Sequence, residues 1–369
     1  MLKNRGKIAL MAVAFNLALQ VIAPVTAVSQ DTSSREVLVR KAIDFLRIRG
    51  QQPDGAVSPK VGVGVTALAA TALIQNDVPL QDPMVAKAVM LVAGSAREDG
   101  GIYAPDSRIR MYETCVAMLC LQAANHDGRY DGLLARAAKY IKGEQFTESK
   151  GLDPSDADYG GAGYGGASRP DLSNTTFFVD ALSHMKQGDH DEAIEKALAF
   201  VSRCQNLESA HNTGKHAAKI NDGGFYYTVS EGGVSAAGDT PDGGLRSYGS
   251  MTYAGLKSMI YAGLTPDDSR VTAALTWVQK HYTLDSNPGL GDAGLFYYYH
   301  LFAKSLDAAG LAEITDANGV QHDWRAELVE HLAMLQAADG SWTNKNSRWM
   351  EGDPNLATVF SLLALSYCK

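Results

Sequence analysis

Hydrophobic residues recur along this chain at intervals of three and four positions, the spacing typical of amphipathic helices. The first such segment carries Val39, Ala42, Phe45 and Leu46, and a polar turn separates it from a second, alanine-rich segment at residues 65–73. Alanine loses little side-chain freedom in a helix and lets neighbouring helices approach closely. The second segment is therefore predicted to be a buried inner helix, and the two segments to form a helical hairpin.

The same hairpin pattern occurs six times. Each copy has an amphipathic segment, a turn and a more apolar segment, and the copies follow one another about every 45 residues, or about every 60–70 where loops are long. No run of strand length alternates between β-branched and polar residues. The last segment, which stops at Lys369, is as apolar as the internal ones. An open solenoid needs polar capping helices, so the pattern predicts six units that close on themselves.

Residues 1–27 have the features of a secretory signal peptide. Three basic residues precede an apolar run at residues 8–21, and small residues up to Ala27 offer a cleavage site. The run is too short for a membrane span, and polar residues follow it. These features predict a secreted or periplasmic protein, cleaved near Ala27, with a single domain over residues 28–369 and no integral membrane segment in the mature chain.

Charge and cysteine content limit the possible partners. The formal charge is −8, and loss of three basic residues with the signal peptide makes it about −11. Basic residues are not clustered, which argues against nucleic acid and anionic membrane surfaces. Cys115 and Cys120 lie on one predicted helix and cannot bridge each other. Cys204 and Cys368 can pair only if the fold brings them together.

The clearest turn between two predicted helices runs from Gln336 through Gly340 to Trp342, and weaker copies occur elsewhere, as at Gln51. The form Gln-x-x-x-Gly-x-Trp resembles the repeat of the terpene cyclase and protein prenyltransferase superfamily. The resemblance covers nearly all of the mature chain in six copies of varying quality. It implies an all-α fold, an (α/α)6 toroid with six inner helices around a central cavity and six outer helices around them. It also implies that Gln336, with Trp342, ties helix ends together, and less clearly Gln51.

The catalytic signatures of that superfamily are missing. Triterpene cyclases protonate an alkene with Asp-x-Asp-Asp at the start of an inner helix, and no corresponding stretch here has paired acids; an isolated carboxyl group is too weak an acid for that step. Prenyltransferases bind zinc with aspartate, cysteine and histidine, where this chain has Asp292, Gly294 and Ala357. One carboxylate cannot build a tetrahedral zinc site. His211 and His216 are interpreted as solvated loop residues. We expect no metal and no cofactor.

Candidate site residues lie where inner helices are predicted to begin. Glu113 directly precedes a threonine of the repeat, so it is the leading candidate for a catalytic acid or base; the alternative is an acid held by the helix dipole. Candidate ligand-binding residues are aromatic or polar groups near the same ends: Tyr112, Asn174, Arg246, Tyr248, Asp292, Tyr297, His300, Arg348 and Trp349. The two arginines have an alternative role in anchoring loops.

Three functions remain open on the sequence alone. The leading hypothesis is an exported cyclase-like or prenyltransferase-like toroid whose aromatic cavity binds an isoprenoid-like or other ligand, with catalysis not established by any motif. Tyrosine-rich cavities also suit stacked sugars, so the second is a polysaccharide-active enzyme or glycan-binding toroid. The third is a non-enzymatic interaction module that uses its long loops. The sequence does not indicate an oligomeric state.

Overall fold

The computed structural model describes residues 34–166, 168–185 and 191–369. Contacts along the chain separate Met1–Thr32 from Ser33–Lys369, and everything below concerns the second unit. The predicted signal peptide and its cleavage site near Ala27 therefore lie outside the described residues. Within the described residues, no helix combines the length and apolar character that a membrane crossing requires.

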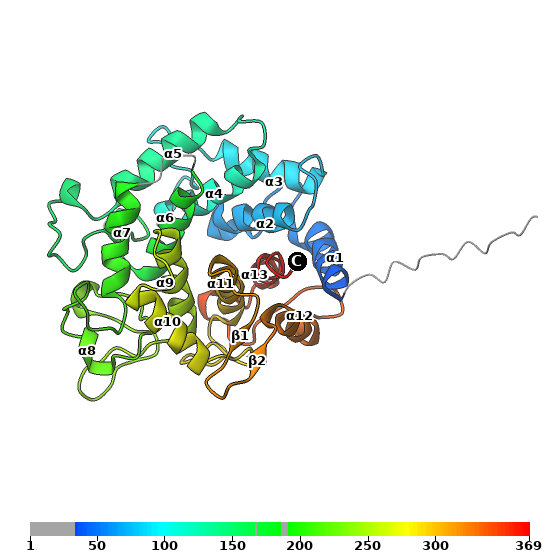
Figure 1. Cartoon of the computed structure of the whole chain (residues 1–369). Helices are drawn as coiled ribbons and strands as arrows, with labels where there is room; N and C mark the ends of the chain where they lie inside the picture. The colour runs from blue at the N-terminus through cyan, green and yellow to red at the C-terminus, as the bar shows by residue number, and fades with distance from the viewer. Residues whose placement is uncertain (1–33, 167, 186–190) are drawn as a thin grey trace, which may run out of the picture. The chain divides into compact units, whose positions relative to one another are not determined.

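The inner layer of the described unit is a closed ring of helices. Its members in chain order are α2 (Gly64–Gln75), α4 (Arg110–Ala124), α6 (Leu172–Ser183), α9 (Gly249–Tyr261), α11 (Leu295–Ala308) and α13 (Pro354–Leu365). Each helix contacts the next, and α13 contacts α2 (Figure 1). The inner helices are buried nearly all round, as expected for helices without a polar face. The predicted all-α toroid is confirmed.

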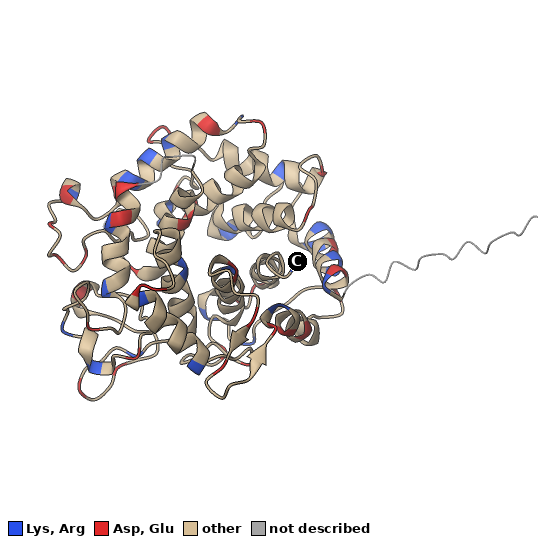
Figure 2. Ribbon diagram, in the orientation of Figure 1, with Lys and Arg blue, Asp and Glu red and all other residues tan. Residues whose placement is uncertain are grey.

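An outer layer of helices surrounds the ring. Its members are α1 (Ser34–Phe45), α3 (Pro83–Gly94), α5 (Asp131–Glu144), α7 (Glu192–Arg203), α10 (Ser269–Lys280) and α12 (Trp324–Leu335). Lys, Arg, Asp and Glu lie mostly on these helices and on the loops (Figure 2). Six helices of the two layers begin with an aspartate that accepts a first-turn N–H, which satisfies a donor left free at a helix start: Asp82, Asp171, Asp191, Asp268, Asp323 and Asp353.

The connections contain short elements only. A hairpin of two short antiparallel strands pairs β1 (Ile314–Thr315) with β2 (Gln321–His322). Each strand has two residues, and Ile314 lies opposite His322. The remaining short elements are one π-turn, four single 3-10 turns and a four-residue helix: η1 (Leu46–Gly50), η2 (Pro59–Val61), η3 (Glu148–Lys150), η4 (Ser230–Gly232), η5 (Arg348–Met350) and α8 (Ala217–Ile220).

Glutamine side chains link four of the six outer helices to the next one. In four repeats the Nε2 group donates to the carbonyl of the turn glycine and to a carbonyl in the first turns of the next outer helix, over 2.8 to 3.1 Å. The four residues are Gln51, Gln145, Gln205 and Gln336. Gln336 donates to Leu38 of α1, so the last repeat is joined to the first by the same bond that joins internal repeats.

Two further residues, a glycine and a threonine, fix the turn in five of the six repeats. Five turn glycines have φ between 80° and 98°, and a Cβ atom on them would lie 1.8 to 3.0 Å from a carbonyl oxygen of the next outer helix: Gly55, Gly100, Gly160, Gly223 and Gly340. Five buried threonines at the starts of inner helices accept a turn N–H on Oγ1 at 2.9 to 3.1 Å: Thr66, Thr114, Thr175, Thr252 and Thr358. These contacts hold the turns and the beginnings of the inner helices together.

The four cysteines are free thiols. Cys115, Cys120 and Cys204 are buried, Cys368 is half-buried, and no pair is bonded. Burial raises the pKa of the Cys115 thiol, and of the Cys120 thiol to about 12. These thiols therefore act as small apolar groups in the core.

Candidate functional site

A cavity of about 640 Å³ opens where the inner helices begin. All six inner helices contribute residues from their first two turns, and loops complete the rim. The helical lining comprises Gly64, Val65, Tyr112, Ser173, Phe177, Ser250, Met251, Tyr297, Leu356 and Phe360. The cavity therefore lies on the axis of the ring, where the toroid prediction placed it.

Aromatic rings from four inner helices form one connected wall of this cavity. The Phe177 ring meets Tyr112 edge-on, with centroids 5.1 Å apart, and stacks on Tyr297 at 6.4 Å. Tyr297 in turn contacts Phe360 of α13 at 5.5 Å. Burial raises the pKa of the Tyr112 and Tyr297 phenols far above neutrality, so both rings stay uncharged. The wall is a buried aromatic cluster suited to an apolar ligand.

A second wall of the cavity is polar and is built around Asp171, the residue that caps α6. Asp171 is 2% exposed; its Oδ1 accepts the backbone N–H of Asn174 at 2.8 Å, and its Oδ2 accepts Asn174 Nδ2 at 2.7 Å. The hydroxyl of Tyr227 lies near the Asp171 carboxylate, and the hydroxyl of Tyr164 lies near Tyr227 and Asn174. Tyr164 and Tyr227 line the cavity. We call these four residues the hydroxyl cluster.

The Asp171 carboxyl group is a weaker acid than an aspartate usually is. Burial raises its pKa to about 6, although the hydrogen bonds from Asn174, the nearby Tyr227 hydroxyl and the charge of Arg169 oppose the change. Sequence reasoning missed this residue because an aspartate before a helix is ordinarily a cap. One feature of the sequence distinguishes Asp171. It stands directly before an inner helix, and that helix also contains Asn174.

The rim of the cavity carries two arginines and an exposed tryptophan. Arg169 Nη1 donates to Glu231 Oε2 at 2.9 Å, and the Arg348 guanidinium lies 4.2 Å from the centre of the Trp349 ring. Trp349 and Met350 both have positive φ, 53° and 67°, which costs energy for residues with a Cβ atom. Trp349 is nevertheless 48% exposed. The strained backbone holds a large apolar side chain at the entrance.

The structure separates the predicted ligand-binding residues into two groups. Those that line the cavity are Tyr112, Tyr248, Tyr297, Arg348 and Trp349. The others do not appear in its lining: Asn174, Arg246, Asp292 and His300. Asn174 holds Asp171 from behind the wall, whereas Arg246 and Asp292 are exposed loop residues.

Glu113 is fully buried, and both of its carboxylate oxygens accept backbone hydrogen bonds. Oε1 accepts Val63 N–H at 2.6 Å, and Oε2 accepts Ala104 N–H at 3.2 Å. A Cβ atom on Gly62 would lie 1.9 Å from Oε1, so the loop wraps closely around the carboxylate. Glu113 is not part of the cavity lining. Its geometry is that of a carboxylate that fixes the loops before α2 and α4.

Glu351 plays a similar part at the beginning of α11. Its Oε1 accepts Tyr297 N–H at 2.7 Å, and its Oε2 accepts Phe296 N–H at 3.2 Å and Asn344 Nδ2 at 2.7 Å. Burial raises the pKa of this carboxyl group. Glu351 is the one carboxylate in the described cavity lining, and its oxygens are already engaged by these donors.

A buried charge cluster lies further along the inner helices. The Asp180 carboxylate of α6 accepts a hydrogen bond from Lys257 Nζ of α9. Its Oδ2 atom also accepts one from Lys304 Nζ of α11 at 2.7 Å. Burial alone would raise the pKa of Asp180, but the two ammonium groups lower it to about 2. Burial lowers the pKa of Lys257 to about 7, and burial together with the two lysines keeps the pKa of His300 well below its usual value.

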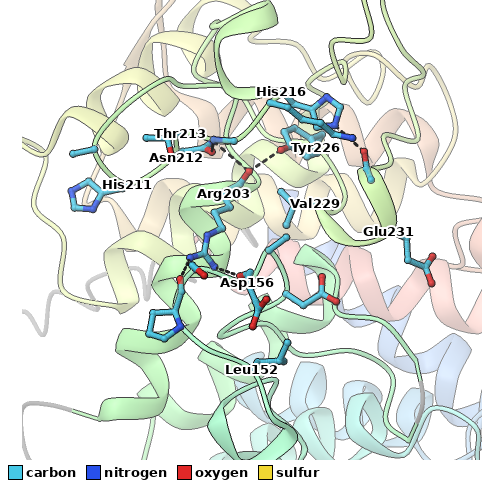
Figure 3. A pocket seen from close by; sticks show the side chains of 18 residues that line it. Leu152, Asp156, Arg203, His211, Asn212, Thr213, His216, Tyr226, Val229 and Glu231 are labelled. Atoms are coloured by element: carbon cyan, nitrogen blue, oxygen red, sulfur yellow. Dashed lines mark hydrogen bonds between the residues drawn. The ribbon is translucent and has the colours of Figure 1, made fainter.

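A separate surface pocket of about 710 Å³ lies among the loops near α7 (Figure 3). Arg203 stands in it and donates from Nη1 to Asp156 O at 2.9 Å, while Tyr226 Oη donates to Arg203 O at 2.7 Å. The ring nitrogens of His216 lie 3.0 and 2.8 Å from two glycine carbonyls, and His211 is exposed. Across the described residues, no group of three or more metal-ligating side chains is assembled. The polar groups of this pocket mainly join loops.

Comparison with known proteins supports the fold. No protein-family model and no curated protein matches the sequence. Among solved structures, a protein from Actinoplanes aligns with a TM-score of 0.51 at 14% identity, over 90% of this chain and 99% of its own. A variant of the type II terpene cyclase MstE from Scytonema aligns with a TM-score of 0.49 at 14% identity, over 91% of this chain and 96% of its own.

These likenesses concern the fold alone and transfer no residue roles. The protein is an α/α toroid, as the ring of inner and outer helices shows directly. The all-α toroid that the repeat turns imply is thus confirmed by the arrangement of the helices themselves.

Proposed function

We propose that the protein binds an apolar, isoprenoid-like ligand in the central cavity. The observation that carries the proposal is the continuous aromatic wall of Tyr112, Phe177, Tyr297 and Phe360 around a space of about 640 Å³. Cavities of a few hundred Å³ lined mainly by apolar and aromatic groups typically enclose a whole small molecule. Trp349 stands at the entrance and adds an apolar surface there.

The proposal is for binding rather than for alkene protonation. A strong enough acid needs a second carboxyl group to share and stabilise its charge. Glu351, the one carboxylate among the described lining residues, is occupied by backbone and amide donors.

Binding is tested with purified mature protein and a panel of isoprenoids and oligosaccharides, read by native mass spectrometry and tryptophan fluorescence. Met251→Trp fills the cavity, because Met251 lines it from α9 and is 3% exposed. Met334→Trp is the matched control, because Met334 is 75% exposed on α12 and outside the cavity lining. We expect isoprenoid binding at least about tenfold weaker in the first variant and unchanged in the second. Equal binding in both variants, or binding of oligosaccharides alone, would reject the proposal.

We also propose that the protein is exported. The support is the basic and apolar pattern of residues 1–27. N-terminal sequencing of the protein recovered outside the cytoplasm tests it, with a mature chain expected to begin just after Ala27. Recovery of full-length protein in the cytoplasm alone would overturn it.

A further inference from the structure

The charged residues in the described lining of the central cavity are Arg169, Arg348 and Glu351. Glu351 is engaged by two backbone N–H groups of α11 and by Asn344. Arg169 forms an ion pair with Glu231, with Nη1 and Oε2 2.9 Å apart. Arg348 differs from both, because within the described part of the chain no group forms an ion pair with its guanidinium or accepts a hydrogen bond from it. The mouth of the cavity therefore presents one cationic group that is available to a ligand.

The Arg348 side chain is held in place by the residues that follow it. Its guanidinium lies over the Trp349 ring, 4.2 Å from the ring centre. Trp349 packs closely on Gly294, where a Cβ atom would lie 3.0 Å from the indole ring. Trp349 and Met350 have positive φ, and Glu351 ties the end of this segment to α11. Strained backbone is typical of ligand-binding positions, so the segment is suited to presenting Arg348 to a ligand.

The contact with the indole ring leaves the hydrogen-bonding edge of the Arg348 guanidinium free. A cation over an aromatic ring is attracted by the face of that ring. The five N–H donors of an arginine lie in the plane of the guanidinium group, and two of them can bind both oxygens of one carboxylate. Arg348 can therefore contact Trp349 and bind an acidic group at the same time.

The polar wall of the cavity does not suit a negative charge. This wall is the hydroxyl cluster, in which Asp171 is 2% exposed. Burial raises the pKa of Asp171 to about 6, so its carboxyl group is mostly ionised above neutral pH. A second anion close to it would be repelled. An acidic group of a ligand is thus favoured at Arg348, with the apolar part of the ligand against the aromatic wall.

The charge available at the mouth limits which acidic group fits. A carboxylate has one negative charge, which one guanidinium balances. A phosphate group has up to two negative charges at neutral pH, and transferable phosphate chains are usually held by several cationic groups together with Mg²⁺. Arg169 is already paired, and the described residues assemble no group of three or more metal-ligating side chains. A carboxylate therefore matches this mouth better than a phosphate or a diphosphate.

We propose that the ligand of the central cavity is an apolar molecule with one carboxylate group, which binds the Arg348 guanidinium at the mouth. The inference rests on the proposed function and adds the acidic group of the ligand and the residue that recognises it. The aromatic wall binds the apolar body, and Arg348 determines which end of the ligand faces the solvent.

The test compares farnesoic acid with methyl farnesoate, which has the same chain without the charge, by titration at pH 7.5 and low salt. We expect the wild-type protein to bind the acid about fivefold more tightly than the ester, as one partly exposed ion pair allows. About 0.5 M salt should narrow this ratio, because ions screen an exposed pair. Farnesyl diphosphate should bind no more tightly than the acid.

Variants assign the preference to Arg348. Arg348→Gln should weaken binding of the acid about fivefold and leave binding of the ester unchanged. Arg348→Lys keeps the charge without the two-donor geometry, so about a twofold preference should remain. Arg40→Gln is the matched control, because it removes one positive charge from an exposed position on α1 that is outside the cavity lining. It should keep the full preference. Thermal unfolding verifies that each variant is folded.

The outcomes separate the two proposals. Equal binding of acid and ester by the wild-type protein at low salt overturns this inference and leaves apolar ligand binding intact. The inference also fails if Arg348→Gln keeps the preference, if it loses acid and ester alike, or if the diphosphate binds about tenfold more tightly than the acid. Failure of all these compounds, and of the wider isoprenoid panel, overturns the proposed function and this inference with it.

Discussion

Lys257 of α9 donates to both carboxylate oxygens of Asp180 of α6, at 2.5 Å each. The two side chains are 1% and 2% exposed, and Lys304 of α11 binds the same carboxylate. Two ammonium groups therefore share one carboxylate inside the ring, and three inner helices meet at it. Removing a partner from a buried ion pair leaves an uncompensated charge, so the three residues should differ sharply in their effect on stability.

Asp180→Ala should lower the free energy of unfolding by about 3–5 kcal/mol, because it leaves two buried lysines without a counter-ion. Lys257→Met keeps a one-to-one pair of Asp180 with Lys304 and removes the charge in excess. We expect it to change stability by no more than about 1 kcal/mol. Urea unfolding of the two variants measures the difference. Equal losses would show that charge balance is not what stabilises this cluster.

The excess positive charge should also make the free energy of unfolding change with pH above neutrality. Burial lowers the pKa of Lys257 to about 7 from the usual value of 10.5. Between these values the unfolded chain binds the proton that the folded protein has lost, so the free energy of unfolding rises with pH, by at most about 1.4 kcal/mol per pH unit. Below pH 7 the full cost of the buried charge is present. Lys257→Met should flatten this rise, and an identical slope in the variant would rule out Lys257 as its source.

Asp171 should have the opposite dependence in acid. Its folded pKa of about 6 exceeds the ordinary 3.8, so the folded protein binds more protons between these values and stability falls as pH rises through them. The difference in the free energy of unfolding between Asp171→Asn and wild type should therefore shift in favour of the variant as the pH rises from about 4 to about 7. The shift should be up to about 3 kcal/mol. Urea unfolding at several pH values measures it. A constant difference would mean that Asp171 titrates normally.

Trp342 should be essential for the last repeat. Its side chain is fully buried and its Nε1 donates to Leu332 O at 2.9 Å. Trp342→Ala should cost about 3–5 kcal/mol, as large-to-small core substitutions do. Trp342→Phe keeps much of the volume and should cost less. A loss below about 1 kcal/mol for alanine, measured in urea, would contradict the buried position.

Glu113→Gln should destabilise the protein although it is nearly isosteric. Glutamine has one acceptor oxygen, and its NH₂ group would face a backbone N–H donor of Val63 or Ala104. We expect a loss of about 1–3 kcal/mol, the cost of leaving a buried donor unsatisfied. Glu98→Gln, at an exposed position, is the control and should change little. A neutral Glu113→Gln with reduced ligand turnover would instead assign Glu113 a catalytic role.

The helical periodicity and the clear repeat turn were sufficient to predict the ring, but not all of its links. Gln336 and Gln51 lie four residues before the glycine whose carbonyl they bind, so the spacing is visible in the sequence. Gln145 and Gln205 form the same bond across 15 and 18 residues, because loops are inserted between them and their glycines. A pattern defined by spacing cannot find these copies, although the folded turns are equivalent.

The site was less predictable for a similar reason. Aromatic residues at the starts of inner helices indicate a cavity wall, and Tyr112 and Tyr297 line it. The charge cluster joins Asp180 to two lysines that lie 77 and 124 positions further along the chain. In the sequence each of the three looks like an isolated polar residue in an apolar helix. Only closure of the ring brings them together. The acidity of Asp171 likewise depends on burial, which its place before a helix does not reveal.

The bond from Gln336 to Leu38 has a consequence for how the chain reaches its native state. It joins residues 298 positions apart, whereas the equivalent bond from Gln51 to Met84 spans 33. Loop-closure entropy and contact order make such a distant contact slow to form, so the seam between α1 and α12 is expected to close late in folding. A circular permutant that joins Lys369 to Ser34 and opens the chain at an exposed loop would turn this seam into a local contact. Every contact of the ring would be preserved, but the order in which they form would change.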